Sequence, residues 1–208
     1  FNYSSFYNGK INNSVFLSSS LKDVKFYDMQ TSEVMFENDT FNGTTFTKGT
    51  GAGLKFSRCR GEKGLTFVRT TLENIIFEDC NDLRYLTIHG TTVNNLSFNR
   101  NQNIINPALN ESKLNSLSIR NSEFSQFDIE ESEITGNSLI SNSVIKGFNF
   151  SSSKATGLTL ENSTIAEYMI LKDAKFENLR LNNINYIKPV KVLDDGVNYI
   201  NSNIFRVQ

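Results

Sequence analysis

The sequence predicts an all-β fold, a solenoid of parallel strands whose coils take about 20–21 residues. Three observations predict it. Large apolar residues recur every five positions, the residues two positions before them alternate between apolar and small, and neither spacing fits a helix or a flat strand. Residues five apart on an α-helix are rotated by about 500° and form no stripe, whereas a strand shows a period of two.

The five-residue lattice starts near the N-terminus and continues, with small slips, to Leu181. A chain that turns a corner every five residues places one lattice residue at the centre of each side. Four sides make a coil of about 20 residues, which stacks on the next coil at roughly 4.8 Å by parallel pairing. We therefore expect internal columns of the following residues: Phe6, Ile11, Phe16, Leu21, Phe26, Phe36, Phe41, Phe46, Phe56, Phe67, Leu72, Phe77, Ile88, Val93, Phe98, Leu114, Ile119, Phe124, Ile129, Ile134, Ile140, Ile145, Phe150, Ala155, Leu160, Ile165, Ile170, Phe176 and Leu181.

The residue two positions before each lattice member predicts how crowded that side is. It is apolar before alternate members, as at Leu65, Ile75 and Leu86, and small before the others, as at Ser143 and Ser153. We expect the small residues to lie inside the coil at its crowded corners.

Two stretches carry a resemblance to a known family. Ser163-Thr-Ile165-Ala-Glu and Ala174-Lys-Phe176-Glu-Asn178 resemble the pentapeptide-repeat family, whose unit is a small residue, Asp or Asn, then Leu or Phe, then two polar residues. The resemblance extends from about Phe6 to Leu181 and implies a right-handed, four-sided β-helix. A leucine-rich repeat is the alternative, because Val93-Asn-Asn-Leu96-Ser-Phe98 fits its frame. Two such strands in each coil of about 21 residues favour the closed coil over the horseshoe.

Two segments depart from the lattice, and we expect them to distort the coil. The glycine-rich segment Thr47 to Leu65 and the segment Asn101 to Lys113 are predicted to leave it as loops or bulges. Pro107 lies in the second segment and offers no N–H to a strand ladder.

The C-terminal segment has a different pattern. Polar and apolar residues alternate around Asp195-Gly196, which is a hairpin signal. We therefore expect a β-helix over residues 1–185 and a cap or hairpin over residues 186–208. The chain opens on Phe1 without a cap, and we expect it to be part of a larger protein.

The spacing also predicts which residues stack. Cys59, Cys80, Asn101 and Ser122 are each 21 residues apart and should form a ladder of small or amide side chains. The residues just before them, Arg58, Asp79, Arg100 and Asn121, should form an outward ladder with alternating charge. Neighbouring coils would bring the two cysteines close together, and we expect them to be free thiols.

Composition excludes several classes of function. Lys and Arg number 21 against 22 Asp and Glu, so no strong field favours nucleic acid. No apolar run approaches the roughly 20 residues of a membrane helix. Two cysteines and one histidine provide neither a disulfide framework nor a metal cluster, and we expect no cofactor.

No catalytic constellation is apparent in the sequence. His89 has no nucleophile beside it and fits an outward turn position. The segment Gly49 to Gly53 lacks the Lys-Ser/Thr of a phosphate-binding loop. The adjacent pairs Glu130-Glu131 and Asp194-Asp195 should diverge, because neighbouring residues of a strand face opposite sides. Carboxylates from stacked coils can still converge, so a carbohydrate-active β-helix enzyme remains an alternative to a non-enzyme.

One local charge asymmetry marks a candidate partner-binding site, the basic cluster. It comprises Lys55, Arg58, Arg60, Lys63 and Arg69. Runs of charge are more often solvated than functional, so a plain loop is the competing interpretation.

We therefore expect a non-catalytic scaffold that binds a protein partner. The family resemblance implies several settings, among them secreted bacterial effectors that act in a host cell. The alternative location is the bacterial cytoplasm. Another setting, the acidic DNA mimics, does not fit the near-zero net charge of this chain.

Overall fold

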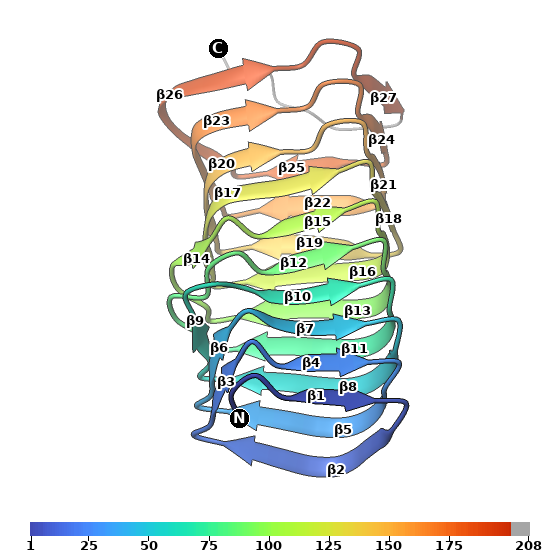
Figure 1. Ribbon diagram of the computed structural model, residues 1–208. Helices are drawn as coiled ribbons and strands as arrows, with labels where there is room; N and C mark the ends of the chain where they lie inside the picture. The colour runs from blue at the N-terminus through green and yellow to red at the C-terminus, as the bar shows by residue number, and fades with distance from the viewer. Residues whose placement is uncertain (201–208) are drawn as a thin grey trace.

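The protein is described by a computed structural model, in which residues 1–200 can be placed. These residues form 27 strands and no helix, and the strands stack into one long solenoid from the N-terminal end to the C-terminal end (Figure 1). The described residues therefore include no helix that could cross a lipid bilayer.

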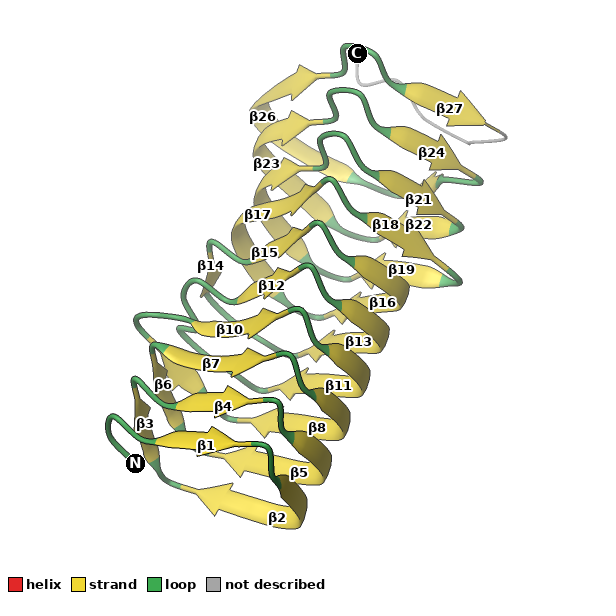
Figure 2. Ribbon diagram, turned by 45° about the vertical axis from the view of Figure 1, so that its right-hand side comes forward, coloured by secondary structure: helices red, strands yellow, loops and turns green. Residues whose placement is uncertain are grey.

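The strands make three sheets that run along the solenoid axis (Figure 2). One sheet contains 11 strands: β1 (Ser5–Tyr7), β4 (Lys25–Tyr27), β7 (Thr44–Thr47), β10 (Leu65–Val68), β12 (Thr87–His89), β14 (Ile104–Ile105), β15 (Ala108–Asn110), β17 (Glu123–Glu130), β20 (Val144–Asn149), β23 (Thr164–Ile170) and β26 (Asn185–Leu193). A second contains 13: β2 (Lys10–Leu17), β5 (Gln30–Glu37), β8 (Thr50–Ser57), β11 (Thr71–Glu78), β13 (Thr92–Asn99), β16 (Lys113–Arg120), β18 (Glu133–Thr135), β19 (Ser138–Ser141), β21 (Lys154–Thr156), β22 (Leu158–Glu161), β24 (Lys175–Glu177), β25 (Arg180–Asn182) and β27 (Asn198–Ile200). The third contains β3 (Ser20–Lys22), β6 (Thr40–Asn42) and β9 (Arg60–Gly61).

All sheet pairs are parallel and join residues one coil apart, which confirms the predicted fold class. Phe16 pairs with Phe36 and Phe36 with Phe56, a coil length of 20 residues. Phe56 pairs with Phe77 and Phe77 with Phe98, a length of 21. The horseshoe alternative is wrong, because the chain closes each coil through strands on opposite sides.

Phenylalanine columns fill the core. Phe36, Phe56, Phe77 and Phe98 stack with ring centroids 5.0, 4.7 and 5.0 Å apart, and each is at most 1% exposed. The predicted alternation is also confirmed. Apolar residues such as Ile75 point inward on alternate sides, and small residues occupy the inside of the other corners.

Each corner is made by a residue in the left-handed region. Positive φ angles recur about every five residues from Tyr3 to Asn183, and most of these residues are Asn, Asp, Ser or Glu. Asn and Asp tolerate this conformation better than other non-glycine residues. The polar corners therefore account for much of the Asn content of the chain.

The prediction that the glycine-rich segment leaves the coil is wrong. β8 and β9 both lie within it and pair with the coils on either side. Gly61 pairs with Phe41 at 20 residues, whereas Leu65 pairs with Thr44 at 21. The turn between Gly61 and Leu65 therefore absorbs the single extra residue, and the glycines serve close packing between coils.

The segment Asn101 to Lys113 also stays in the coil, contrary to prediction. β14 and β15 pair with β17, and Pro107 is buried. The carbonyl oxygen of Pro107 accepts the N–H of Asp128 at 3.0 Å. Proline is tolerated here because its carbonyl still serves the next coil.

The C-terminal segment forms a further coil as far as residue 200. β26 pairs in parallel with β23, and β27 with β24. Asp195-Gly196 therefore turns between two sides of a coil, and not between antiparallel hairpin strands. The remainder of the expected cap, residues 201–208, lies outside the described residues.

We predict that Phe98→Ala destabilises the protein by about 3–5 kcal/mol, because it removes a buried ring from a packed column. Its ring lies 5.0 Å from that of Phe77 and 5.2 Å from that of Phe124. Chemical denaturation measures the loss. Ser97→Ala, at the neighbouring outward position, is the control and should change little; equal effects at both sites would contradict the inward column.

We also predict that Gly49→Ala costs about 1–3 kcal/mol, in the range of overpacking. A Cβ at Gly49 would overlap the backbone carbonyl oxygen of Met29. Gly9 stands one coil to the other side of Met29 in the same column, but its Cβ would meet the flexible end of that side chain at 3.0 Å. Gly9→Ala should therefore be milder in the same thermal melt, and the reverse order would refute this packing.

Candidate binding groove

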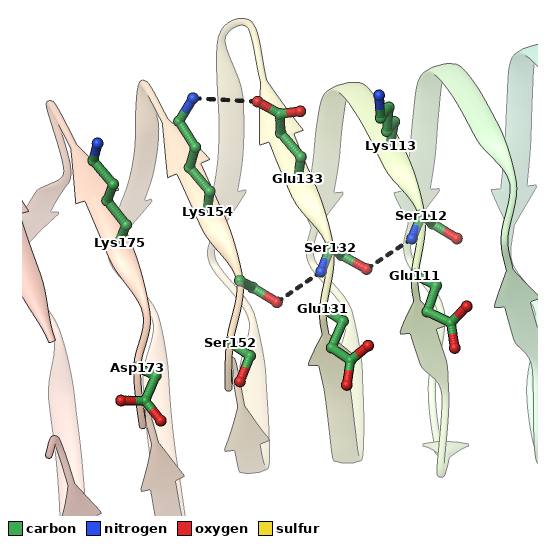
Figure 3. A pocket seen from close by; sticks show the side chains of 11 residues that line it. Glu111, Ser112, Lys113, Glu131, Ser132, Glu133, Ser152, Lys154, Asp173 and Lys175 are labelled. Carbon is green, nitrogen blue, oxygen red and sulfur yellow. Dashed lines mark hydrogen bonds and ion pairs between the residues drawn. The ribbon is translucent and has the colours of Figure 1, made fainter. Parts of the chain in front are cut away.

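A groove runs along one corner of the solenoid, where the 11-stranded sheet turns into the 13-stranded sheet (Figure 3). It spans four coils, from the turn between β15 and β16 to the turn between β23 and β24, and has a volume of about 460 Å³. Its lining residues are Glu111, Ser112, Lys113, Glu131, Ser132, Glu133, Ser152, Ser153, Lys154, Asp173 and Lys175.

The floor of the groove is a ladder of buried serines. The N–H of Ser112 donates to Oγ of Ser132 at 3.1 Å, and the N–H of Ser132 donates to Oγ of Ser153 at 3.0 Å. The hydroxyl of Ser132 in turn donates to the carbonyls of Leu109 and Glu130. These hydroxyls are fully used by the backbone, so they hold the coils together and are not free nucleophiles.

The two sides of the groove carry rows of charge. The corner row consists of Glu111, Glu131, Ser152 and Asp173, all exposed, and the other row consists of Lys113, Glu133, Lys154 and Lys175. In Figure 3 the acidic corner side chains and the lysine side chains point in opposite directions from the serine floor. Nζ of Lys154 is 3.2 Å from Oε1 of Glu133. The other lysines of the row reach toward solvent.

This arrangement suits an extended polar ligand better than a buried small molecule. Small-molecule sites are mostly apolar and cover most of the ligand, whereas this groove is shallow, open and charged. Within residues 1–200 no three His, Cys, Asp or Glu side chains are placed to share a metal ion. The charged rows repeat once per coil, at about 4.8 Å.

Sequence reasoning missed this groove, although a signal exists. The order acid, small residue, charged residue recurs at Glu111–Lys113 and Glu131–Glu133, and then at Asp173–Lys175. Aligning the sequence at the coil length of 20–21 residues stacks these triplets. The pattern was hidden because its period is that of the coil and not that of the five-residue lattice.

The basic cluster predicted from the sequence does not form one surface. The coil carries Lys55 on β8, Arg58 and Arg60 around the next corner, Lys63 in the turn before β10, and Arg69 at the corner after it. Lys55 is paired with Glu78 at 2.8 Å, and Arg58 with Glu37. Nε of Arg60 donates to Oγ1 of Thr40 at 3.2 Å. Lys63 and Arg69 are exposed. The five cations therefore point in several directions.

Arg58 of this cluster also belongs to the predicted outward ladder of Arg58, Asp79, Arg100 and Asn121. Arg100 lies 2.8 Å from Asp79 and 2.8 Å from Glu78. The Lys55 ammonium, and secondarily Arg100, hold the pKa of Glu78 below its usual value, and Arg100 does the same for the pKa of Asp79. The side chains of these groups are 24–52% exposed, so the ladder is a screened surface network.

The buried ladder behind it is also confirmed. The N–H of Cys80 donates to Oδ1 of Asn101 at 2.9 Å, and the N–H of Asn101 donates to Oγ of Ser122 at 3.1 Å. Cys59 and Cys80 occupy neighbouring places in the column and are both buried free thiols.

The carboxylates and the histidine do not assemble into a catalytic set in the described residues. Glu131 lies in the groove, whereas Glu130 accepts a hydrogen bond from Asn149 at 2.5 Å on the adjoining face. Asp128 lies beside Glu130 on that face, and burial raises the pKa of its carboxyl. Nε2 of His89 is 4.0 Å from Oε2 of Glu111.

Comparison with known proteins gives matches at the level of structure. No protein-family model matches the sequence, and no curated protein matches it. Among solved structures, polygalacturonase from Erwinia carotovora ssp. carotovora superposes with a TM-score of 0.58 at 10% identity, over 85% of this chain and 59% of that chain. At this identity the likeness shows the fold alone.

Two further matches are full-length but looser. HetL, a pentapeptide repeat protein involved in heterocyst differentiation regulation in the cyanobacterium Nostoc sp. strain PCC 7120, has a TM-score of 0.39 at 9% identity, over 93% of this chain and 88% of HetL. QnrB1, a plasmid-mediated fluoroquinolone resistance protein, has a TM-score of 0.37 at 14% identity, over 89% of this chain and 92% of that chain. HetL is itself a pentapeptide repeat protein, the family that Ser163–Glu167 and Ala174–Asn178 resemble.

We predict that Arg100→Gln lowers the melting temperature at low salt, and that the difference shrinks in about 1 M salt, where screening is strong. The ionised forms of Glu78 and Asp79 stabilise the fold above their unfolded pKa values, and this contribution is lost as pH falls through the lowered folded values. Removing Arg100 should reduce that loss in a pH series of melts.

Arg120→Gln is the matched control for Arg100, because Arg120 is exposed on the next coil and donates to Oγ of Ser118. It should show neither the salt dependence nor the altered acid limb. An Arg100 variant that behaves like the Arg120 variant would show that the ladder is energetically silent.

Proposed function

We propose that this solenoid is a non-catalytic scaffold that binds an extended, charged segment of a partner protein along the groove of Figure 3. The observation that carries the proposal is the pair of charged rows over four successive coils. Solenoids offer long regular surfaces and use them for recognition. The groove, and not the solenoid fold, supports the proposal, because a fold by itself does not determine function.

The chemistry of the groove favours a segment with both signs of charge. Exposed carboxylates line the corner, and lysines lie across the serine floor. An extended peptide can place side chains on both rows at once, and its backbone remains partly hydrated. Rim-type charges of this kind contribute more to association rate and specificity than to affinity.

The basic cluster fits this function less well, because two of its cations are already ion-paired and the five point in several directions. A setting in a larger, secreted bacterial effector that acts in a host cell remains part of the proposal. In that setting the groove would dock a host protein while a neighbouring region acts on it.

Polysaccharide cleavage is the second candidate function, and one observation favours it. Asp128, whose pKa is raised by burial, lies beside Glu130 on a face shared with Asn149 and Tyr168. In glycosidases a carboxyl group with a raised pKa acts as the general acid beside a second carboxyl group. Neither carboxyl group lines the groove of Figure 3.

The test begins with a photo-crosslinking residue at Thr156 on β21, beside the groove, to capture the partner. The same residue at Asn12 on β2, at the N-terminal end of the same sheet, is the matched control. With the captured partner purified, Lys113→Gln combined with Lys175→Gln should weaken binding by roughly tenfold, as expected for two exposed ion pairs.

Lys10→Gln is the charge control, because Lys10 occupies the same outward column several coils away from the groove. It should leave the affinity unchanged. Unchanged binding in the double groove variant would place the partner elsewhere. Turnover of a polysaccharide panel that disappears in Asp128→Asn would establish the second candidate instead.

A further inference from the structure

One member of the buried corner column differs chemically from all the others. The column lies on the inside of the corner that precedes β3, β6 and β9, and its members are Ser19, Asp39, Cys59, Cys80, Asn101, Ser122, Ser143 and Ser163. Asp39 is the one carboxyl group among them. It is 0% exposed, and its Oδ2 has no hydrogen-bond partner.

The other buried members both accept and donate a hydrogen bond. Each accepts the backbone N–H of the member one coil earlier, as Asn101 accepts that of Cys80 at 2.9 Å. Each also donates to a carbonyl: Asn101 to that of Phe77 at 3.0 Å, and Cys59 to that of Phe36 at 3.3 Å. Thiol, amide and hydroxyl groups can all play both parts.

Asp39 makes the accepting half of this pattern. Its Oδ1 accepts the N–H of Ser19 at 2.5 Å. The donating half would go to the carbonyl of Phe16, which pairs in register with Phe36 and so occupies the equivalent place one coil earlier. A carboxylate is an acceptor only and cannot make this donation. A protonated carboxyl group can donate.

We propose that Asp39 is a neutral carboxylic acid in the folded protein, and that its ionisation loosens the N-terminal coils, so that this corner acts as a pH-sensitive latch. The proton comes from solvent and returns to it when the corner opens. Below the transition the column is continuous through Asp39, and above it the coil of Asp39 loses the bond from its carboxyl group to the Phe16 carbonyl in the preceding coil.

The surroundings of Asp39 support the neutral form. Burial raises the pKa of its carboxyl, backbone hydrogen bonding at Ser19 and at Glu37 opposes this in part, and the charge of Glu37 adds to it. The other titratable group in the column beside it is the buried thiol of Cys59. The nearby cations are engaged elsewhere, Arg58 with Glu37 and Arg60 with Thr40. No described cation therefore compensates a charge on Asp39.

The sign of the effect follows from linkage. A carboxyl group whose folded pKa lies above its unfolded value binds more protons in the folded state. Its contribution to stability is complete below the unfolded pKa of about 3.9 and is lost as pH rises through the folded pKa. Above the folded pKa this group no longer makes stability depend on pH. This is opposite to Glu78 and Asp79, whose contribution is lost as pH falls.

The chain offers a natural design for the test, because Asn101 occupies the same place in the column as Asp39. Asp39→Asn can donate to the Phe16 carbonyl at any pH. It should therefore raise the melting temperature near pH 8 by at least about 3 °C relative to wild type, a measurable shift in a chain of this size. The difference should vanish at low pH.

Asn101→Asp is the converse variant and should introduce the same pH dependence three coils farther along. Asp28→Asn is the control, since Asp28 is exposed at a corner with φ of 52°. Asparagine adopts this left-handed conformation as readily as aspartate. It should leave the pH profile unchanged. A direct reading comes from the carboxyl ¹³C shift of Asp39, which should report a protonated group at pH values where exposed aspartates are ionised.

Either of two results would overturn the proposal. One is a carboxyl ¹³C shift that titrates at or below the ordinary aspartate value. The other is an Asp39→Asn variant that folds, as judged by circular dichroism, but is no more stable than wild type near pH 8. Hydrogen exchange of Ser19 and Cys59 amides, faster in wild type than in Asp39→Asn at the same pH, would place the loosening at this corner.

Discussion

Parallel pairing between residues one coil apart is the constraint on which the whole structure depends. Because strands bond to the strand one coil later, 20 or 21 residues away along most of the solenoid and 23 in the last coil, each side chain stacks on the side chain at the same place in the next coil. A residue is therefore tolerated only if its side chain packs or hydrogen-bonds with the side chains at the same place in the neighbouring coils. Phenylalanine stacks on phenylalanine at about 5 Å in the core, and hydroxyls pass hydrogen bonds from coil to coil at the corners. Stability comes from columns that run the length of the molecule and not from a single central cluster.

The same constraint explains why many polar and charged side chains are already bonded within the protein. Corner hydroxyls such as that of Ser132 serve the backbone on both sides. Charges such as Arg100 and Asp79 neutralise one another along the axis. A partner can bind where a column of charged side chains is not paired with the column beside it. The groove from Glu111 to Lys175 is such a place. Asp39 is the corresponding exception inside the molecule, where one column receives a group that, when ionised, supplies only the accepting half of the required hydrogen bonds.

Residues of the same type that lie close together in the sequence can lie on different sides of the coil and have different partners. Arg58 and Arg60 are two positions apart, yet the first is ion-paired with Glu37 and the second bonds Thr40 on the next side. The corner between them redirects the chain, so a basic run in the sequence becomes a belt around the rod. Residues 20 or 21 positions apart, in contrast, become neighbours. A functional surface on such a fold is therefore to be sought with the period of the coil.

The sequence by itself determined the parallel solenoid, its internal Phe, Ile and Leu columns, the alternation of small and apolar inward residues, and the stacking of Cys59, Cys80, Asn101 and Ser122. These are repetitive features, and a repeated pattern reports the repeat of the backbone directly. Only the tertiary structure decided that the glycine-rich segment stays in the coil, that the basic cluster disperses, and that Glu131, Lys154 and Asp173 line one groove. Those outcomes depend on where the single extra residue between Gly61 and Leu65 is absorbed and on the direction of each corner. One residue shifts every later column, and pairing between coils, rather than local propensity, fixes where that shift occurs.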